Sequence, residues 1–154
     1  MHEQGYEMRK LLLGLSLVLI ASFAVAHPQD GLNPEGLLRY YIKVFNQEDT
    51  GSLEDVYHFP NVKIQSGKLV VQEGKGSPID YETLKKSGWK YSKVNSIKNL
   101  SEGSNSALLE MDYSRYDAND KDFLRLTGFY VLTKNAGYWQ ILSFTNIGVP
   151  ANAK

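Results

Sequence analysis

The sequence predicts an α+β domain in which three helices near the amino terminus pack on a curved antiparallel sheet. Helix-capping signals lie only in the segment before Gly88, whereas four long alternating runs follow it, joined by short polar turns. Helices and strands that are segregated along the chain are typical of this layered architecture. The 154 residues, 42% hydrophobic and 22% charged, suit one globular domain.

The composition also excludes several classes of protein. The 17 basic and 17 acidic side chains balance, so a nucleic-acid binder that depends on a large positive excess is excluded, as is an acidic disordered tail. The absence of cysteine excludes disulfides, cysteine–zinc sites and thiol nucleophiles. We therefore expect no nucleic-acid partner, no metal site of the usual transition-metal kind and no cofactor.

The first 26 residues predict a secretory signal peptide. Two basic residues precede an apolar run over residues 11–26, which ends in Ala24-Val25-Ala26. A charged start, a short apolar run and small residues at the cleavage site are typical of such peptides. The run is shorter than the ~20 residues of a membrane span. We expect an exported domain over residues 27–154, periplasmic or extracellular and not bound to the membrane; an uncleaved signal anchor is the alternative.

Three helices are expected, over residues 34–47, 53–57 and 78–87. The first begins with an asparagine N-cap followed by proline and carries an apolar stripe. For the second, Ser52 and Asp55 have the spacing of a capping box. The third follows a Ser-Pro-Ile-Asp sequence, which is another N-cap signal, and a glycine ends it.

The remaining segments predict strands. Alternating residues on both sides of a Ser-Gly turn indicate a hairpin over residues 62–65 and 69–71. After the third helix the long runs follow one another directly, which is typical of an antiparallel meander. These runs cover residues 89–99, 106–116, 122–133 and 138–147.

Several short strings occur at matching places along these elements: Tyr40-Tyr41 with Val44-Phe45-Asn46, His58-Phe59-Pro60-Asn61-Val62, Arg115-Tyr116-Asp117, and Phe129-Tyr130-Val131 with Gly137-Tyr138-Trp139-Gln140-Ile141. In this order they resemble the SnoaL-like proteins of the nuclear-transport-factor-2-like superfamily. The resemblance covers residues 34–147 and implies a cone-shaped, cystatin-like fold. It does not imply one function, because the superfamily includes isomerases, dehydratases, cyclases and non-enzymatic modules.

His58 is the candidate general base, because it is the one histidine inside the domain beyond His27 at the expected new terminus. The alternative is a histidine that caps a helix end or bonds a carbonyl. Isomerase and cyclase relatives use an aspartate base, but the first hairpin here reads Gln65-Ser66 and offers no carboxylate. Asp112 alternates onto the face opposite the apolar one, so we expect it to be solvated.

Arg115 is the candidate anion-binding residue, because alternation places it on the same face as Met111 and Tyr113. A buried guanidinium needs either a carboxylate of the protein or an anionic ligand; the alternative is a side chain that reaches water at the strand end. The aromatic residues that could face a ligand in the cone, or else fill the core, are Tyr41, Trp89, Tyr91, Tyr113 and Trp139.

The outer face of the meander is a candidate partner surface. Apolar side chains are mixed there with charges: Leu108, Tyr116 and either Phe129 or Tyr130. Apolar patches of this kind mark interfaces. We therefore expect a two-fold homodimer.

Two hypotheses of function follow. The first is an exported, non-catalytic module that binds a small apolar or weakly anionic molecule in its cone. The second is a cofactor-free lyase or isomerase in which His58 is the base, while tyrosines and Arg115 orient the substrate. The missing hairpin carboxylate favours the first hypothesis. A cavity shared by His58 and Arg115 would strengthen the second, and a cone filled by aromatic rings would weaken it.

Overall fold

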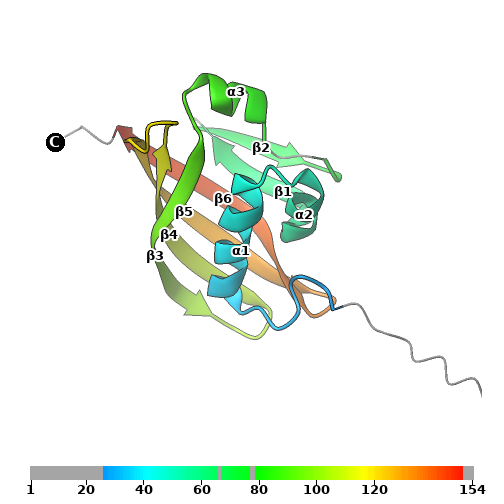
Figure 1. The fold of residues 1–154 in the computed structure, drawn as a ribbon. Coiled ribbons are helices and arrows are strands. Elements are labelled where there is room, and N and C mark those ends of the chain that lie inside the picture. The colour runs from blue at the N-terminus through cyan, green and yellow to red at the C-terminus, as the bar shows by residue number, and fades with distance from the viewer. Residues whose placement is uncertain (1–25, 66, 77–78, 151–154) are drawn as a thin grey trace, which may run out of the picture.

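The computed structural model describes residues 26–65, 67–76 and 79–150 (Figure 1). The predicted signal peptide lies outside the described residues except for its last one. No helix among the described residues is long and apolar enough to cross a membrane. The elements follow the order α1 (Pro34–Asn46), α2 (Thr50–Val56), β1 (Tyr57–Gln65), β2 (Lys68–Gln72), α3 (Tyr81–Lys86), β3 (Tyr91–Glu102), β4 (Ser106–Tyr116), β5 (Asp122–Asn135) and β6 (Tyr138–Pro150).

The six strands form one sheet in the order β2-β1-β6-β5-β4-β3. The neighbouring strands are antiparallel except for β1 and β6, which run parallel. The sheet is therefore mixed, which corrects the expectation of a wholly antiparallel sheet. After β2 the chain passes through α3 to the opposite edge of the sheet. The β3–β6 meander then returns across the sheet, and its turns set the direction in which β6 meets β1.

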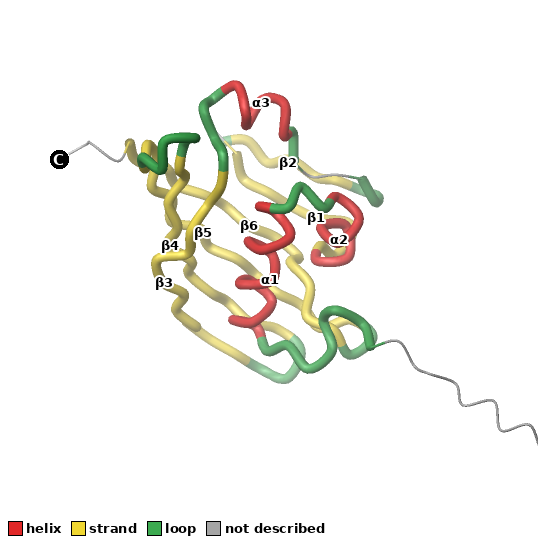
Figure 2. Tube along the Cα trace, in the orientation of Figure 1, coloured by secondary structure: helices red, strands yellow, loops and turns green. Residues whose placement is uncertain are grey.

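The helices lie on one face of the curved sheet (Figures 1 and 2). α1 packs against β3, β4 and β6, and α2 packs against β1 and β6. α1 begins as predicted, because the Asn33 side chain accepts a hydrogen bond from the Gly36 N–H at 2.7 Å. Its buried residues recur at helical spacing and face the sheet: Leu37, Leu38, Tyr41, Ile42, Val44 and Phe45.

The other two helices begin at caps different from those predicted. Asp49 caps α2, and its carboxylate accepts from the N–H of Ser52 at 3.1 Å, so Ser52 lies inside the helix. Asp80 caps α3 and accepts from the N–H of Thr83 at 3.0 Å; the Ser-Pro start predicted for this helix lies outside the described residues. Aspartate is a strong N-cap, and its charge is favoured at a helix N-terminus.

The core fills the space between the helices and the concave face of the sheet. In β4, alternation holds as predicted: Ala107, Leu109 and Met111 are buried on this face. In β5, Tyr130 is fully buried, while Phe129 belongs to the convex face opposite Glu110. The choice left open between these two residues for the outer face therefore falls on Phe129.

Candidate functional site

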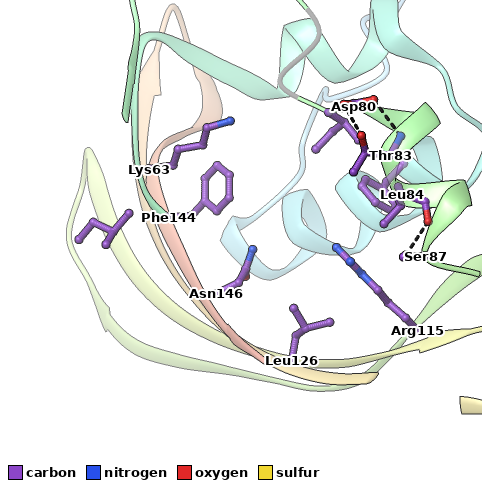
Figure 3. A pocket seen from close by; sticks show the side chains of 12 residues that line it. Lys63, Asp80, Thr83, Leu84, Ser87, Arg115, Leu126, Phe144 and Asn146 are labelled. Carbon is purple, nitrogen blue, oxygen red and sulfur yellow. Dashed lines mark hydrogen bonds between the residues drawn. The ribbon is translucent and has the colours of Figure 1, made fainter. Parts of the chain in front are cut away.

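A cavity of about 430 Å³ lies between the concave face of the sheet and α3 (Figure 3). Its size is in the range of small-molecule sites. The sheet side of the lining consists of Lys63, Ile64, Arg115, Leu126, Phe144 and Asn146. The helix side consists of Phe45, Ile79, Asp80, Thr83, Leu84 and Ser87.

Strand register brings the sheet residues together. Lys63 pairs with Phe144 across the parallel β1–β6 contact, and Asn146 follows two residues later on the same face of β6. Gly128 lies opposite Asn146 on β5. A Cβ on Gly128 would lie 2.5 Å from Asn146 Oδ1 and closer still to the Tyr130 ring. This glycine therefore makes room for both side chains at the floor of the cavity.

Arg115 directs its guanidinium into the cavity (Figure 3). Its Nε is buried and has no hydrogen-bond partner within the described part of the chain. No carboxylate in that part forms an ion pair with it. Burial raises the pKa of the neighbouring Tyr113, and the positive charge of Arg115 partly opposes this rise. Of the roles considered for Arg115, an ion pair with a described carboxylate is therefore excluded.

The polar groups of the helix side are occupied by contacts within the chain. The Asp80 carboxylate caps α3 and also accepts from the Thr83 hydroxyl at 2.7 Å. These hydrogen bonds lower the pKa of Asp80. The Ser87 hydroxyl donates to the Leu84 carbonyl at 2.6 Å. Asp80 is the one carboxylate among the described lining residues, beside the two cations Lys63 and Arg115.

Tyrosine hydroxyls lie beneath the cavity floor. The Tyr130 hydroxyl donates to Asn146 Oδ1 at 3.3 Å, which connects this buried layer to the cavity. Burial is the main cause that raises the pKa of Tyr41, Tyr57, Tyr113 and Tyr130. All four hydroxyls therefore stay protonated at physiological pH, and that of Tyr57 has no hydrogen-bond partner among the described residues.

Several predicted aromatic residues fill the core instead of lining the cavity. Tyr41 and Tyr113 are buried beneath it, and Trp89 packs edge-on against Phe45 with ring centroids 5.2 Å apart. The indole N–H of Trp89 donates to Ser92 Oγ at 3.0 Å. Trp139 is also buried. None of the four predicted residues Tyr41, Trp89, Tyr113 and Trp139 is among the described lining residues.

Tyr91 does not face the cone at all, so that prediction is wrong. It pairs with Tyr116 on the convex face, where the two rings stack with centroids 5.0 Å apart. Its hydroxyl donates to Asp120 at 2.8 Å, and the Lys93 ammonium lies over both rings. The first residue of β3 therefore points opposite to the direction expected from the sequence.

The two titratable candidates also lie outside the cavity. His58 is half-buried on β1, and its Nδ1 has no partner among the described residues. It is absent from the described lining, so it does not share the cavity with Arg115. Asp112 is on the convex face as predicted, but it is ion-paired with Arg125 and bonded to Asn95 instead of simply solvated.

The sequence interpretation missed Lys63, Phe144 and Asn146. Alternation in β1 and β6 separates two faces but does not say which one is concave, so these side chains carried no local signal. No group of three or more His, Cys, Asp or Glu side chains placed to hold a metal ion occurs in the ranges that the structure describes.

Comparison with known proteins supports the fold. No protein-family profile matches the sequence, and no curated protein matches it. A nuclear-transport-factor-2-like protein from Cytophaga hutchinsonii superimposes with a TM-score of 0.56 at 12% identity, covering 77% of this chain and 100% of that one. A candidate ketosteroid isomerase from Parabacteroides distasonis gives 0.56 at 14% identity, with 80% and 93% covered.

A third solved structure is a candidate calcium/calmodulin-dependent protein kinase II association domain from Xanthomonas campestris. It superimposes with a TM-score of 0.58 at 18% identity, covering 82% of this chain and 94% of that one. At such identities the likeness shows the fold alone. The chain has the nuclear-transport-factor-2-like, cystatin-like fold, as the sequence predicted.

Proposed function

We propose that this chain is a non-catalytic binding module that holds a small organic anion in the cavity of its cone. Arg115 carries the proposal, because its guanidinium points into the cavity and its buried Nε lacks a described partner. The charge of this guanidinium has no carboxylate partner in the described part of the chain, and an anion in the cavity would meet its terminal nitrogens. A carboxylate is the best match, since a guanidinium binds it through two parallel hydrogen bonds.

The rest of the cavity suits an apolar body attached to that anion. Phe45, Leu84, Leu126 and Phe144 supply apolar surface around the few polar groups. Small-molecule sites commonly combine mostly apolar walls with a few polar groups that orient the ligand. This arrangement supports an amphipathic ligand rather than a free inorganic ion.

The catalytic alternative has less support. A general base must lie within hydrogen-bond reach of its substrate, and His58 lies outside the described lining. Asp80 does line the cavity, but its carboxylate is committed to the α3 cap. The buried tyrosines are neutral, because burial raises their pKa values.

We also propose that the domain is exported and forms a homodimer through the convex face of the sheet. The signal-peptide features of the first 26 residues support export. One cross-strand row on the convex face reads Val71, Val62, Ser143, Val131 and Leu108. Val71 is 46% exposed, and Val131 and Leu108 are each 37% exposed. Association of two copies would remove this apolar surface from water.

The test of anion binding uses two molecules of matched shape, 4-phenylbutanoate and its neutral amide, in calorimetric titrations. We expect the acid to bind wild type more tightly than the amide and to lose this preference in Arg115→Met. Methionine keeps the apolar stem and removes only the charge. The control is Arg39→Met, because Arg39 is exposed on α1 and pairs with Glu35. Equal binding of acid and amide, or an acid preference that survives Arg115→Met, would contradict the proposal.

A further inference from the structure

We infer that the cavity selects a monocarboxylic acid that carries a second, uncharged acceptor oxygen, such as an oxo group, on an apolar body. This inference rests on the proposed function and names the ligand class more closely. Two features carry it: the donors that face the cavity, and the charge that each of these donors bears.

Beside the Lys63 ammonium on β1, the cavity presents hydrogen-bond donors from two further strands of the concave face. Arg115 on β4 offers its guanidinium, and Asn146 on β6 points its amide into the same space (Figure 3). The polar protons of the helix side are already used, because Thr83 donates to Asp80 and Ser87 donates to Leu84. A ligand that meets this lining therefore needs acceptor oxygens for both Arg115 and Asn146.

The orientation of the Asn146 amide follows from its contact below. Tyr130 donates its hydroxyl proton to Oδ1, which leaves the Nδ2 protons as the donor side of the amide. Nδ2 has no acceptor among the described residues. Asn146 and the Tyr130 ring can occupy these positions because Gly128 has no Cβ atom. The hydrogen bond from Tyr130 thus fixes the Asn146 side chain with its Nδ2 donor beside Arg115.

The charges of the two donors favour a ligand in which only one of the two acceptor groups is ionised. Arg115 is charged, whereas the Asn146 amide is neutral. The planar guanidinium of Arg115 binds a carboxylate through two parallel hydrogen bonds. The group that reaches Asn146 is then a neutral acceptor, for which an oxo oxygen is the simplest choice.

The experiment compares acids on one carbon skeleton by calorimetric titration: 4-phenylbutanoate, 2-oxo-4-phenylbutanoate and 4-oxo-4-phenylbutanoate. We expect at least one oxo acid to bind wild type about fivefold more tightly than the parent acid, the gain of one hydrogen bond. Asn146→Asp has nearly the same size and still accepts from Tyr130, but it replaces the donor with an oxygen and adds a negative charge beside Arg115, so it should also weaken the binding of every acid. This variant should abolish the oxo advantage. Asn146→Leu, checked for folding by circular dichroism, should also abolish it, and the parent acid is titrated on the same variant as the reference.

The outcomes separate the inference from the proposed function. If no acid is preferred over the neutral amide, the proposed function itself is wrong. If the acids bind through Arg115 but neither oxo acid gains affinity, the inference is wrong and the proposed function stands. An oxo advantage that persists in both Asn146 variants overturns the inference as well. A phenyl-substituted dicarboxylate that binds more tightly than every oxo acid overturns the charge argument.

Discussion

Gly128→Ala is the substitution whose effect the structure defines most sharply. The added Cβ would lie 2.5 Å from Asn146 Oδ1 and 2.9 Å from Tyr130 Cζ. Real Cβ contacts do not occur at such distances, so the Tyr130 ring or strand β6 must move. The Tyr130 ring is fully buried between Tyr41 and Phe144, with centroids 6.2 Å and 5.8 Å away. It therefore has little space into which it can shift.

We expect Gly128→Ala to lower the free energy of unfolding by about 1–3 kcal/mol, the usual effect of overpacking a core. For a domain of this size, each kcal/mol corresponds to roughly 4 °C in Tm. Calorimetric melting should therefore show a Tm lowered by roughly 4–12 °C. Binding of the oxo acid should also weaken, because Asn146 loses its position at the cavity floor.

Gly51→Ala is the matched control for this prediction. Gly51 lies within α2, is exposed, and would place its Cβ 3.7 Å from the nearest described atom. Alanine favours a helix over glycine by about 0.5–1 kcal/mol, so this variant should be at least as stable as wild type. A Gly128→Ala protein that melts with wild-type Tm and binds ligand normally would refute the argument from close packing.

Three further predictions concern the surface and the terminus. Arg125 lowers the pKa of Asp112 in the folded state, so the ionised Asp112 stabilises the fold above the pKa of the unfolded chain, near pH 4. This stabilisation is lost as the pH falls through the lowered pKa of the folded state. Asp112→Asn should therefore reduce the decrease in unfolding free energy at acid pH, measured by denaturant unfolding at a series of pH values. Val131→Glu should give a monomer by light scattering, while Val131→Thr should remain a dimer; a wild-type monomer at micromolar concentration would instead exclude the proposed dimer. Amino-terminal sequencing of the exported protein should begin at His27, and a membrane fraction with an intact leader would indicate a signal anchor.

The sequence by itself determined the features that depend on near neighbours. The Asn33 cap and the apolar stripe of α1 follow from helical spacing. In β4 the strict alternation from Ala107 to Tyr113 determined which side chains are buried, and it also placed Arg115 on the concave face. The order of helices and strands followed from the same local signals, which is why the fold class was predictable.

The tertiary structure decided which strands pair in which register, and which side of each strand lies on the concave face. The parallel pairing of β1 with β6 brings Lys63 beside Phe144, although 81 residues separate them in the chain. Alternation could not tell that Tyr91 points to the convex face and Asn146 to the concave one, because a period of two divides the side chains without saying which set is inside. Only the assembled sheet closes one set around a cavity, and so the residues that line the cavity with Arg115 became visible only in three dimensions.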